Sequence, residues 1–227
     1  MKIKARKKIL KGVSLFSSAG IGETFFKDKG INVVVANELI EERAKLYSSL
    51  YKDTKMIVGD ITNKKIFNKI IHESGENIDF LIATPPCQGI SIAGKNRTLN
   101  EMLKDERNHL VFKIIDFINI KKPNYILIEN VSNFLKLELP FKGKLHTLLE
   151  ILNILYGSSY DIEARVLDAS EYGVPQKRKG IFQLTFRIMR SWLMVKYAEG
   201  IPSVNLGEGS RSCEADQKNP NRIMRVV

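Results

Sequence analysis

The sequence predicts an α/β fold in which helices flank an open, mostly parallel sheet. Short apolar runs bounded by turn residues alternate along the chain with longer segments of helical period, a pattern typical of strand–helix units. Small, acidic or thiol-bearing residues follow several of these runs, at the strand ends where open α/β sheets bind ligands. The 227 residues, 44% of them hydrophobic, suffice for one such domain with a substantial core.

The first half of the predicted domain alternates strands and helices regularly. The apolar runs predict four strands, at residues 13–16, 31–36, 56–58 and 80–83. The segments of helical spacing between them predict three helices, at residues 22–29, 38–51 and 64–73. Parallel strands joined by crossover helices have this order of elements.

The second half continues the pattern and then loses it. A helix at residues 109–120 is closed by Lys121-Lys122-Pro123, and further elements are expected as a strand at 125–128, a helix at 144–156 and two pairing strands at 160–167 and 180–186. After about Arg187 the alternation stops, and polar residues and glycine accumulate from Gly200 onward. We therefore expect one domain at residues 1–186 and a basic, flexible tail at 187–227.

Within this tail, residues 187–197 could form one basic amphipathic helix, whereas residues 210–222 are expected to be unfolded in isolation.

The composition narrows the class of protein. Lys and Arg number 36 against 25 Asp and Glu, a net charge of +11, which favours a polyanionic partner such as nucleic acid over a surface that only maintains solubility. The two cysteines, Cys87 and Cys213, argue against a disulfide framework and fit a reducing interior. The three scattered histidines have no metal-ligand spacing. No apolar run is long enough for a membrane span or a signal peptide, so we expect a cytoplasmic protein.

Cys87 lies in Thr84-Pro85-Pro86-Cys87-Gln88-Gly89, directly after the apolar run at residues 80–83. The two prolines restrict the backbone on the approach to the sulfur and prevent the strand ladder from continuing. A lone cysteine is commonly a small buried hydrophobe. Presentation of the thiol on a stiff turn at a strand's carboxyl end favours a nucleophile instead.

The turn after the first predicted strand, residues 16–23, is rich in small residues, among them Ser18 and Gly20. Such a turn allows a nucleotide-like ligand to approach the backbone closely and to reach free amides. Packing of the following helix against the strand is the alternative explanation.

Two further strand ends carry acidic residues. Glu38, in Asn37-Glu38, is suited to accept hydrogen bonds from two ribose hydroxyls, or it stabilises the N-terminus of the next helix through its dipole. Asp60 could accept a hydrogen bond from an adenine amino group, with Ile61 against the ring, or it forms a cap or turn.

Of the last two candidate segments, one carries an acid and the other a cluster of cations. Glu129-Asn130-Val131 closes the fifth strand, and a carboxyl group at the end of a buried strand suggests chemistry or a ligand contact unless it is solvated there. Residues 172–179, Tyr-Gly-Val-Pro-Gln-Lys-Arg-Lys, place three cations after a proline-stiffened turn. This basic turn could grip phosphates or a flipped base, or be a solvated loop.

Taken together, these segments resemble the cytosine carbon-5 DNA methyltransferase family, in order from Ser14 to Ile181. The segments that carry the resemblance are residues 16–22, Asn37-Glu38, Gly59-Asp60-Ile61, Pro85-Pro86-Cys87-Gln88, Arg107-Asn108-His109-Leu110, Glu129-Asn130-Val131 and Gln176-Lys177-Arg178. The resemblance implies a Rossmann-like methyltransferase domain and S-adenosylmethionine as methyl donor, and the spacing of the histidines leads us to expect no metal. It also implies double-stranded DNA as substrate, as in restriction–modification systems.

The resemblance assigns roles to individual residues. Cofactor contacts are implied for Phe16, Glu38, Asp60, Ile61, Pro86 and Leu110, together with the turn residues Ser18 and Gly20. Cys87 would attack carbon 6 of a flipped cytosine, Glu129 would hold or protonate the ring nitrogen, and Arg178 would support the loop or the base.

The chain departs from the family at three places. Ser18 and Gly180 stand where the family usually has a glycine and an arginine, and the target-recognition region and later motifs are missing. Either this is the first subunit of a split enzyme, with a second chain supplying recognition, or it is a truncated fragment inactive alone. The loss of pattern near Arg187 and the presence of Gly180 favour the fragment.

Three other functions compete with this one. A non-catalytic nucleic-acid-binding protein could keep the fold, but it has no need for both Cys87 and Glu129. An amino-group methyltransferase would be expected to have an aromatic residue in place of Cys87. An RNA methyltransferase with the same thiol chemistry stays open.

Overall fold

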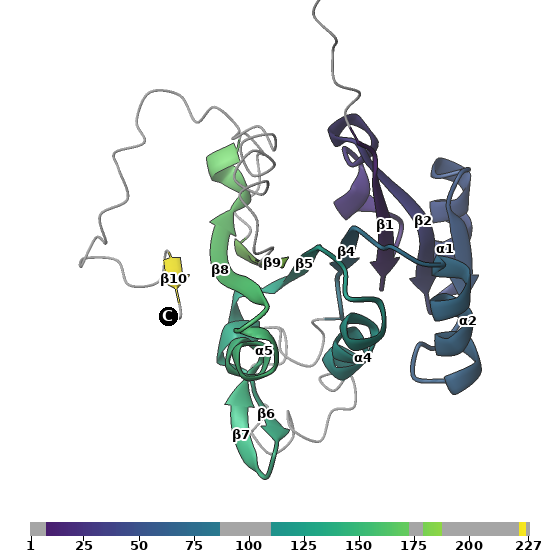
Figure 1. Cartoon of the computed structure of the whole chain (residues 1–227). Coiled ribbons are helices and arrows are strands. Elements are labelled where there is room, and N and C mark those ends of the chain that lie inside the picture. The colour runs from purple at the N-terminus through teal and green to yellow at the C-terminus, as the bar shows by residue number, and fades with distance from the viewer. Residues whose placement is uncertain (1–7, 87–109, 173–178, 188–222, 226–227) are drawn as a thin grey trace, which may run out of the picture.

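The computed structural model describes residues 8–86, 110–172, 179–187 and 223–225, which form a central sheet of eight strands (Figure 1). The sheet has the order β10-β8-β9-β5-β4-β1-β2-β3. Its strands are β1 (Leu10–Leu15), β2 (Ile31–Glu38), β3 (Lys55–Val58), β4 (Phe80–Ala83), β5 (Tyr125–Val131), β8 (Tyr160–Asp168), β9 (Lys179–Arg187) and β10 (Ile223–Arg225). β1 to β5 pair in parallel, whereas β9, β8 and β10 pair antiparallel at one side. The predicted open, mostly parallel α/β sheet is confirmed.

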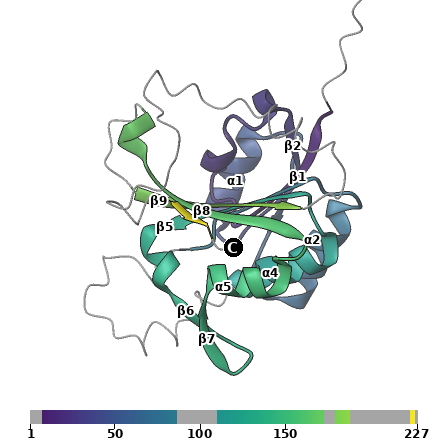
Figure 2. The same cartoon turned by 60° about the vertical axis from the view of Figure 1, so that its left-hand side comes forward.

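Helices cover both faces of the sheet (Figure 2). One face carries α1 (Glu41–Leu50) and two short 3-10 helices, η1 (Ile21–Glu23) and η2 (Lys27–Lys29). The other face carries α2 (Lys64–Ser74), α4 (Val111–Lys121) and α5 (Leu148–Tyr156). Under this second layer lie the largest fully buried apolar side chains of β4, β5 and α4, among them Leu81, Ile126, Ile128, Ile114 and Phe117.

The helix expected at residues 22–29 is wrong, because the structure has the two separate 3-10 helices there. Gly20 and Gly30, which bound this segment, both have left-handed backbones, with φ of 80° and 81°. Between them the hydrogen bonds include short-range pairs such as Glu23 N–H to Gly20 O and Phe26 N–H to Glu23 O, so the chain turns more tightly than an α-helix.

The helix expected at residues 144–156 is wrong in its first four residues. These form β7 (Lys144–Thr147), paired antiparallel with β6 (Glu138–Phe141), and the η5 turn (Ser132–Lys136) joins this hairpin to β5. Lys142 and Gly143 both have positive φ, 50° and 78°, as a two-residue hairpin turn of type I′ requires.

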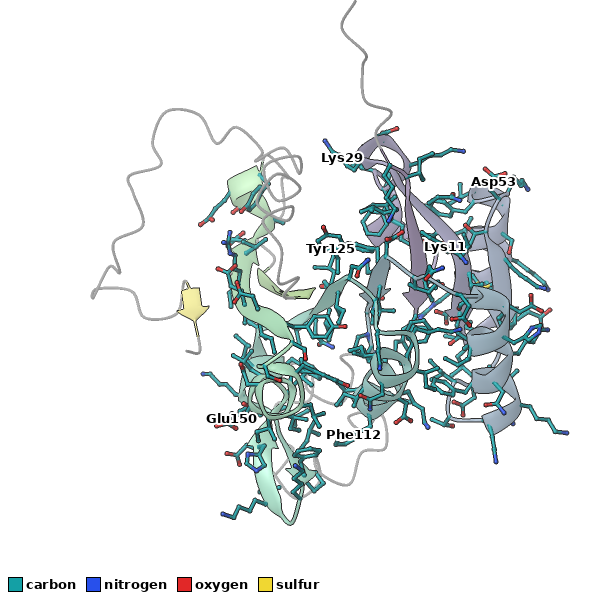
Figure 3. The ribbon with its side chains drawn as sticks, viewed as in Figure 1. Lys11, Lys29, Asp53, Phe112, Tyr125 and Glu150 are labelled. Atoms are coloured by element: carbon teal, nitrogen blue, oxygen red, sulfur yellow. The ribbon has the colours of Figure 1, made fainter. Side chains whose placement is uncertain are left out.

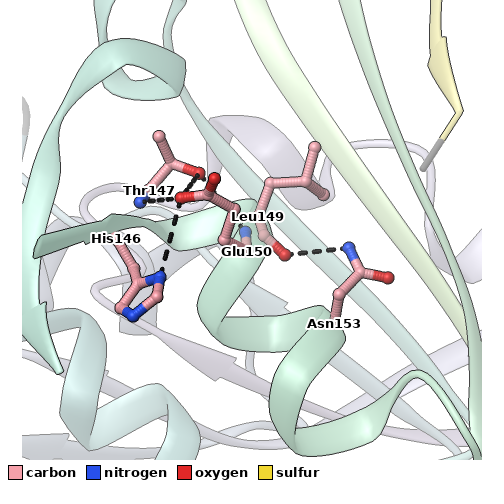
Figure 4. A network of polar contacts seen from close by, with 5 residues as sticks. All are labelled: His146, Thr147, Leu149, Glu150 and Asn153. Carbon is pink, nitrogen blue, oxygen red and sulfur yellow. Dashed lines mark hydrogen bonds and ion pairs between the residues drawn. The ribbon is translucent and has the colours of Figure 1, made fainter. Parts of the chain in front are cut away.

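Thr147 begins α5 with a capping box (Figure 4). The Glu150 amide donates to the Thr147 hydroxyl at 3.3 Å, and the Thr147 amide donates to the Glu150 carboxylate at 2.7 Å. The Thr-x-x-Glu spacing is the sequence pattern that indicates such a helix start.

Asp79 joins β1, β4 and β5 at the edge of the sheet where these strands begin. Its buried carboxylate accepts hydrogen bonds from the Lys8 ammonium at 2.7 Å, the Lys11 amide at 3.0 Å and the Asn124 side chain at 3.2 Å. The three donors come from the starts of β1 and β5, so Asp79 fixes where these strands begin relative to β4.

Three residues of the predicted tail form β10, which pairs with β8, and the helix expected at 187–197 lies outside the described residues apart from Arg187. Within the described part of the chain, every helix is too short or too polar to cross a membrane.

Candidate active site

The predicted site residues that the structure describes lie at or just beyond the ends of the parallel strands β1, β2, β3, β4 and β5 or at the start of α4, and β1 and β2 end at the lower edge of the sheet in Figure 1. Lys29 and Asp53 lie at the opposite, upper edge (Figure 3). Because parallel strands end at one edge, segments far apart in the sequence meet here.

The β1 turn, residues 16–23, has an unusual backbone. Phe16, Ser18 and Gly20 have φ of 58°, 50° and 80°, the left-handed region that favours glycine. Phe16 is half-buried and packs against the core. The position at which Ser18 replaces the family's usual glycine is therefore one where glycine would be unstrained.

Three amides of the β1 turn donate hydrogen bonds within the protein, whereas the sequence suggested amides that are free to bind a ligand. The Ser17 amide donates to the Asn37 carbonyl at 2.9 Å, and the Ser18 amide donates to Glu38 Oε2 at 2.8 Å. The Gly20 amide donates to the Ser17 carbonyl at 2.9 Å. The turn is thus attached to the end of β2.

Glu38 ends β2 and is 6% exposed. Besides the Ser18 amide, its carboxylate accepts a hydrogen bond through Oε1 from the amide of Ile40, the N-cap residue of α1, at 2.9 Å. Each carboxylate oxygen has a second lone pair, so two further hydrogen bonds can be accepted. Beside it Leu39 is 63% exposed, an apolar surface that the sequence did not single out because exposure is not visible in it.

Asp60 and Ile61 lie beyond the end of β3. Asp60 is exposed and accepts a hydrogen bond from the Thr62 amide at 2.8 Å, the turn-forming role considered from the sequence. Ile61 is 4% exposed and belongs to the hydrophobic core. The Asn37 side chain donates to the Gly59 carbonyl at 3.0 Å, which ties the ends of β2 and β3 together.

The proline turn, residues 84–86, follows β4 and is held from two sides. The Thr84 hydroxyl donates to the Phe16 carbonyl at 2.7 Å, and the Thr84 amide donates to the Leu15 carbonyl at 3.1 Å. From β5, Asn130 Nδ2 donates to the Pro85 carbonyl at 3.0 Å. Sequence reasoning missed the anchoring roles of Thr84 and Asn130, which depend on contacts between distant segments.

Cys87 lies outside the described residues, two positions after Pro85, and Pro86 before it is half-buried. The predicted approach of Cys87 to Glu129 therefore stays a prediction.

Glu129 lies within β5 rather than closing it, because the strand continues to Val131. Ala83, the last residue of β4, pairs with Ile128, so Glu129 stands level with the start of the proline turn. Glu129 is half-buried, and it alternates with the buried side chains of Ile128 and Asn130 on the other face.

The remaining two candidates flank undescribed segments. Arg178 lies outside the described residues, but β9 begins at Lys179, and Gly180 pairs with Val131 at the end of β5. Leu110 is half-buried against the core at the start of α4. Gly180 thus lies beside the carboxyl end of β5, the strand that carries Glu129.

A hollow of about 400 Å³ lies elsewhere, along α1 and β3. Its lining contains none of the predicted site residues.

The comparisons with known proteins agree on one family. The family model for C-5 cytosine-specific DNA methylase matches residues 10–212. The Type II methyltransferase M1.HgaI of Avibacterium volantium is 52% identical over 76% of this chain and 49% of its own length. The Type II methyltransferase M.NgoPII of Neisseria gonorrhoeae is 34% identical over 78% of this chain and 48% of its own.

A solved structure has the same fold. The Entamoeba histolytica methyltransferase EhMeth superposes with a TM-score of 0.57 over 80% of this chain and 53% of its own, at 23% identity. The chain spans about half the length of the curated relatives it matches. By the family match and by its identity to these relatives, the chain belongs to the C-5 cytosine-specific DNA methylase family.

Proposed function

We propose that the protein transfers a methyl group from S-adenosylmethionine to carbon 5 of a flipped cytosine in duplex DNA, as the modification enzyme of a restriction–modification system. The attachment of the proline turn carries the proposal. Thr84 binds the end of β1 and Pro85 binds Asn130, so the chain is fixed two residues before Cys87, beside Glu129. Family membership supplies the reaction class.

When bound, S-adenosylmethionine supplies an electrophilic methyl group. We expect it to be held by Phe16, Ser18, Gly20, Glu38, Asp60, Ile61, Pro86 and Leu110. Glu38 fits this role, because backbone amides orient its carboxylate and leave lone pairs for two ribose hydroxyls. Exposed Leu39 offers an apolar surface for an adenine ring.

Cys87 acts as the nucleophile. Its thiolate adds to carbon 6 of the cytosine, and the ring electrons displaced by this bond make carbon 5 nucleophilic. Glu129 donates a proton to the ring nitrogen and so neutralises the developing charge. After methylation a base or water removes the carbon-5 proton, and the returning electron pair expels the Cys87 thiolate. Arg178 supports the loop or the base.

The substrate must be a base outside its helix, because a stacked cytosine is out of reach of Cys87. The net charge of +11 suits a polyanionic substrate of this kind. Target recognition is assigned to a segment outside the motifs from Ser14 to Ile181, on this chain or on a second one, since those motifs account for donor binding and catalysis only. A thiol nucleophile acting on DNA fits the reducing cytoplasm of a bacterial or phage-infected cell.

Covalent trapping tests the proposal. Duplex DNA carrying 5-fluorocytosine is incubated with S-adenosylmethionine and the full chain, with and without a co-expressed recognition chain. Because fluorine cannot leave as a proton does, the Cys87 adduct should accumulate and migrate as a protein–DNA band in denaturing gels.

The two cysteines give a matched pair of variants. Cys213→Ser should trap as the wild type does, whereas Cys87→Ser should lose the adduct. An adduct in Cys87→Ser would refute the assignment of the nucleophile. Trapping on the equivalent RNA but not on DNA would favour the RNA methyltransferase, and DNA binding without trapping in any variant would favour the non-catalytic protein.

A further inference from the structure

Glu23 is a buried acid that the proposed chemistry does not use. It is 3% exposed and is the last residue of both the β1 turn and η1. Its carboxyl group accepts hydrogen bonds from the hydroxyl of Ser14 in β1 and from the hydroxyl of Tyr47 in α1. A buried carboxyl group is costly without such partners, so the contacts between these three side chains hold the segment in place.

The electrostatics favour a fixed direction for the hydrogen bond from Tyr47. Burial raises the pKa of Glu23, and the hydrogen bonds from Ser14 and Tyr47 oppose that rise. Burial and the charge of Glu23 raise the pKa of Tyr47 as well, so its hydroxyl keeps its proton and stays the donor.

Tyr47 connects Glu23 to Gly20, earlier in the β1 turn, through Tyr51. The two rings contact each other with centroids 4.6 Å apart, and the Tyr51 hydroxyl donates to the Gly20 carbonyl at 2.6 Å. A Cβ atom at Gly20 would lie 2.3 Å from the Tyr51 ring and 2.9 Å from the Tyr47 ring. Both tyrosines therefore press directly against the backbone of the turn.

The opposite side of the turn is held by β2, through the hydrogen bond from the Ser18 amide to Glu38. The turn is thus fixed between the acid expected to bind ribose and a tyrosine pair whose position depends on Glu23. A shift of Tyr51 would move Gly20, and with it the amide that orients the Glu38 carboxylate.

We propose that Glu23, acting through Tyr47 and Tyr51, is a positioning residue for the methyl donor: it sets the conformation of the β1 turn on which donor binding depends. This inference rests on the proposed function, because it takes the turn and Glu38 as the donor site. Glu23 itself touches neither the donor nor the cytosine.

Calorimetric binding of S-adenosylmethionine to the full chain tests it. Tyr51→Phe removes only the hydroxyl that holds Gly20 and should weaken donor binding about 3- to 10-fold. Glu23→Gln should weaken it by about 10-fold or more, since an amide cannot accept from both hydroxyls as the carboxylate does. Tyr156→Phe is the matched control, because the buried Tyr156 hydroxyl binds Asn119 at 2.7 Å on the other face of the sheet, and its donor affinity should change less than about 2-fold.

Two readouts separate positioning from loss of stability. The KM for the donor should rise in Tyr51→Phe while the single-turnover rate at saturating donor stays near that of the wild type. Without donor, hydrogen exchange at residues 17–23 should accelerate in Tyr51→Phe and not in Tyr156→Phe.

Donor affinities within 2-fold of the wild type in Tyr51→Phe and Glu23→Gln would overturn the inference. If Glu23→Gln fails to fold, Tyr51→Phe alone decides, because Tyr51 is only half-buried. A wild-type chain that binds no S-adenosylmethionine would instead refute the proposed donor site. Hydrogen exchange would then still show whether the tyrosine pair fixes the turn.

Discussion

Asn130 in β5 donates a hydrogen bond to the carbonyl oxygen of Pro85 at 3.0 Å, which joins the strand that carries Glu129 to the turn that leads to Cys87. Asn130 is 2% exposed, and its Oδ1 accepts from the Val131 amide at 2.8 Å. One buried amide side chain thus orients both the end of β5 and the proline turn, although it is not expected to touch the cytosine.

Asn130→Ala should slow trapping on 5-fluorocytosine DNA by about 10-fold or more, because a displacement of the order of 1 Å at a nucleophile is costly. The free energy of unfolding should fall by about 1–3 kcal/mol, since the Pro85 carbonyl and the Val131 amide lose a buried partner. Trapping rates and urea midpoints of the purified variant measure the two effects.

Asn124→Ala is the control for Asn130→Ala. Asn124 also donates from its side chain, to Asp79 at 3.2 Å, but at the other edge of the sheet. The Asn124→Ala variant should be less stable than the wild type, but its folded fraction should trap 5-fluorocytosine DNA at the wild-type rate. Equal trapping rates in both variants at matched folded fractions would show that Asn130 has no role in placing Cys87.

The elements that the sequence predicted well are those whose signal is local. β4 was predicted with its observed bounds, because Phe80–Ala83 is wholly apolar and prolines follow it. β5 was predicted too short, since Glu129 and Asn130 look like a strand end. Pairing with β9, which is distant in sequence, continues the ladder to Val131 opposite Gly180.

The candidate residues could be assigned to strand ends from the sequence, but their contacts could not. Glu38 and Asp60 could be named from their positions, yet their backbone partners could not. Glu23 gave no signal, because nothing local marks a single acid between Gly22 and Thr24 as buried, and only folding places it between Ser14 and Tyr47.

Glu129→Gln should reduce the single-turnover methylation rate by about 10²-fold or more, because an amide has no proton to give to the ring nitrogen. The half-buried position should accept the isosteric amide, so the urea midpoint should change little. A variant with a wild-type rate would show that ring activation does not depend on this carboxyl group.

Ser18→Gly should stabilise the protein by about 0.5–1 kcal/mol. Ser18 has φ of 50°, where a side chain is strained, although glycine gives back part of the gain through its freer unfolded chain. Donor affinity should be retained, because the amide that binds Glu38 belongs to the backbone. Ser17→Gly is the opposite case: it removes a hydroxyl bound to the Asn37 carbonyl at 3.2 Å and should destabilise. Thermal unfolding that ranks the two variants the other way would contradict the strain argument.

Asp79 should make the stability depend on pH at the acidic end. Burial acts to raise the pKa of its carboxyl group, but hydrogen bonds from Lys8, the Lys11 amide and Asn124 outweigh burial and hold the pKa below its ordinary value. The stabilisation from a lowered pKa is fully present above the unfolded-state pKa of about 3.9 and disappears as the pH falls through the folded-state value.

Asp79→Asn should therefore cost about 1–3 kcal/mol at pH 7, because the amide cannot accept from all three donors, and the Lys8 partner contributes little of this since its side chain is 59% exposed. The difference from the wild type should be constant between pH 7 and pH 5 and should shrink below about pH 4, as the wild-type carboxylate is protonated. Urea midpoints across this range measure it. Asp53→Asn, which removes an exposed ion pair with Lys27, should change the free energy of unfolding by less than about 0.5 kcal/mol at every pH. A difference in the free energy of unfolding that stays constant down to pH 3 would contradict the role of the charge at Asp79. The protonated acid would then stabilise the protein as much as the carboxylate does, so the shape of the side chain rather than its charge would join the strands.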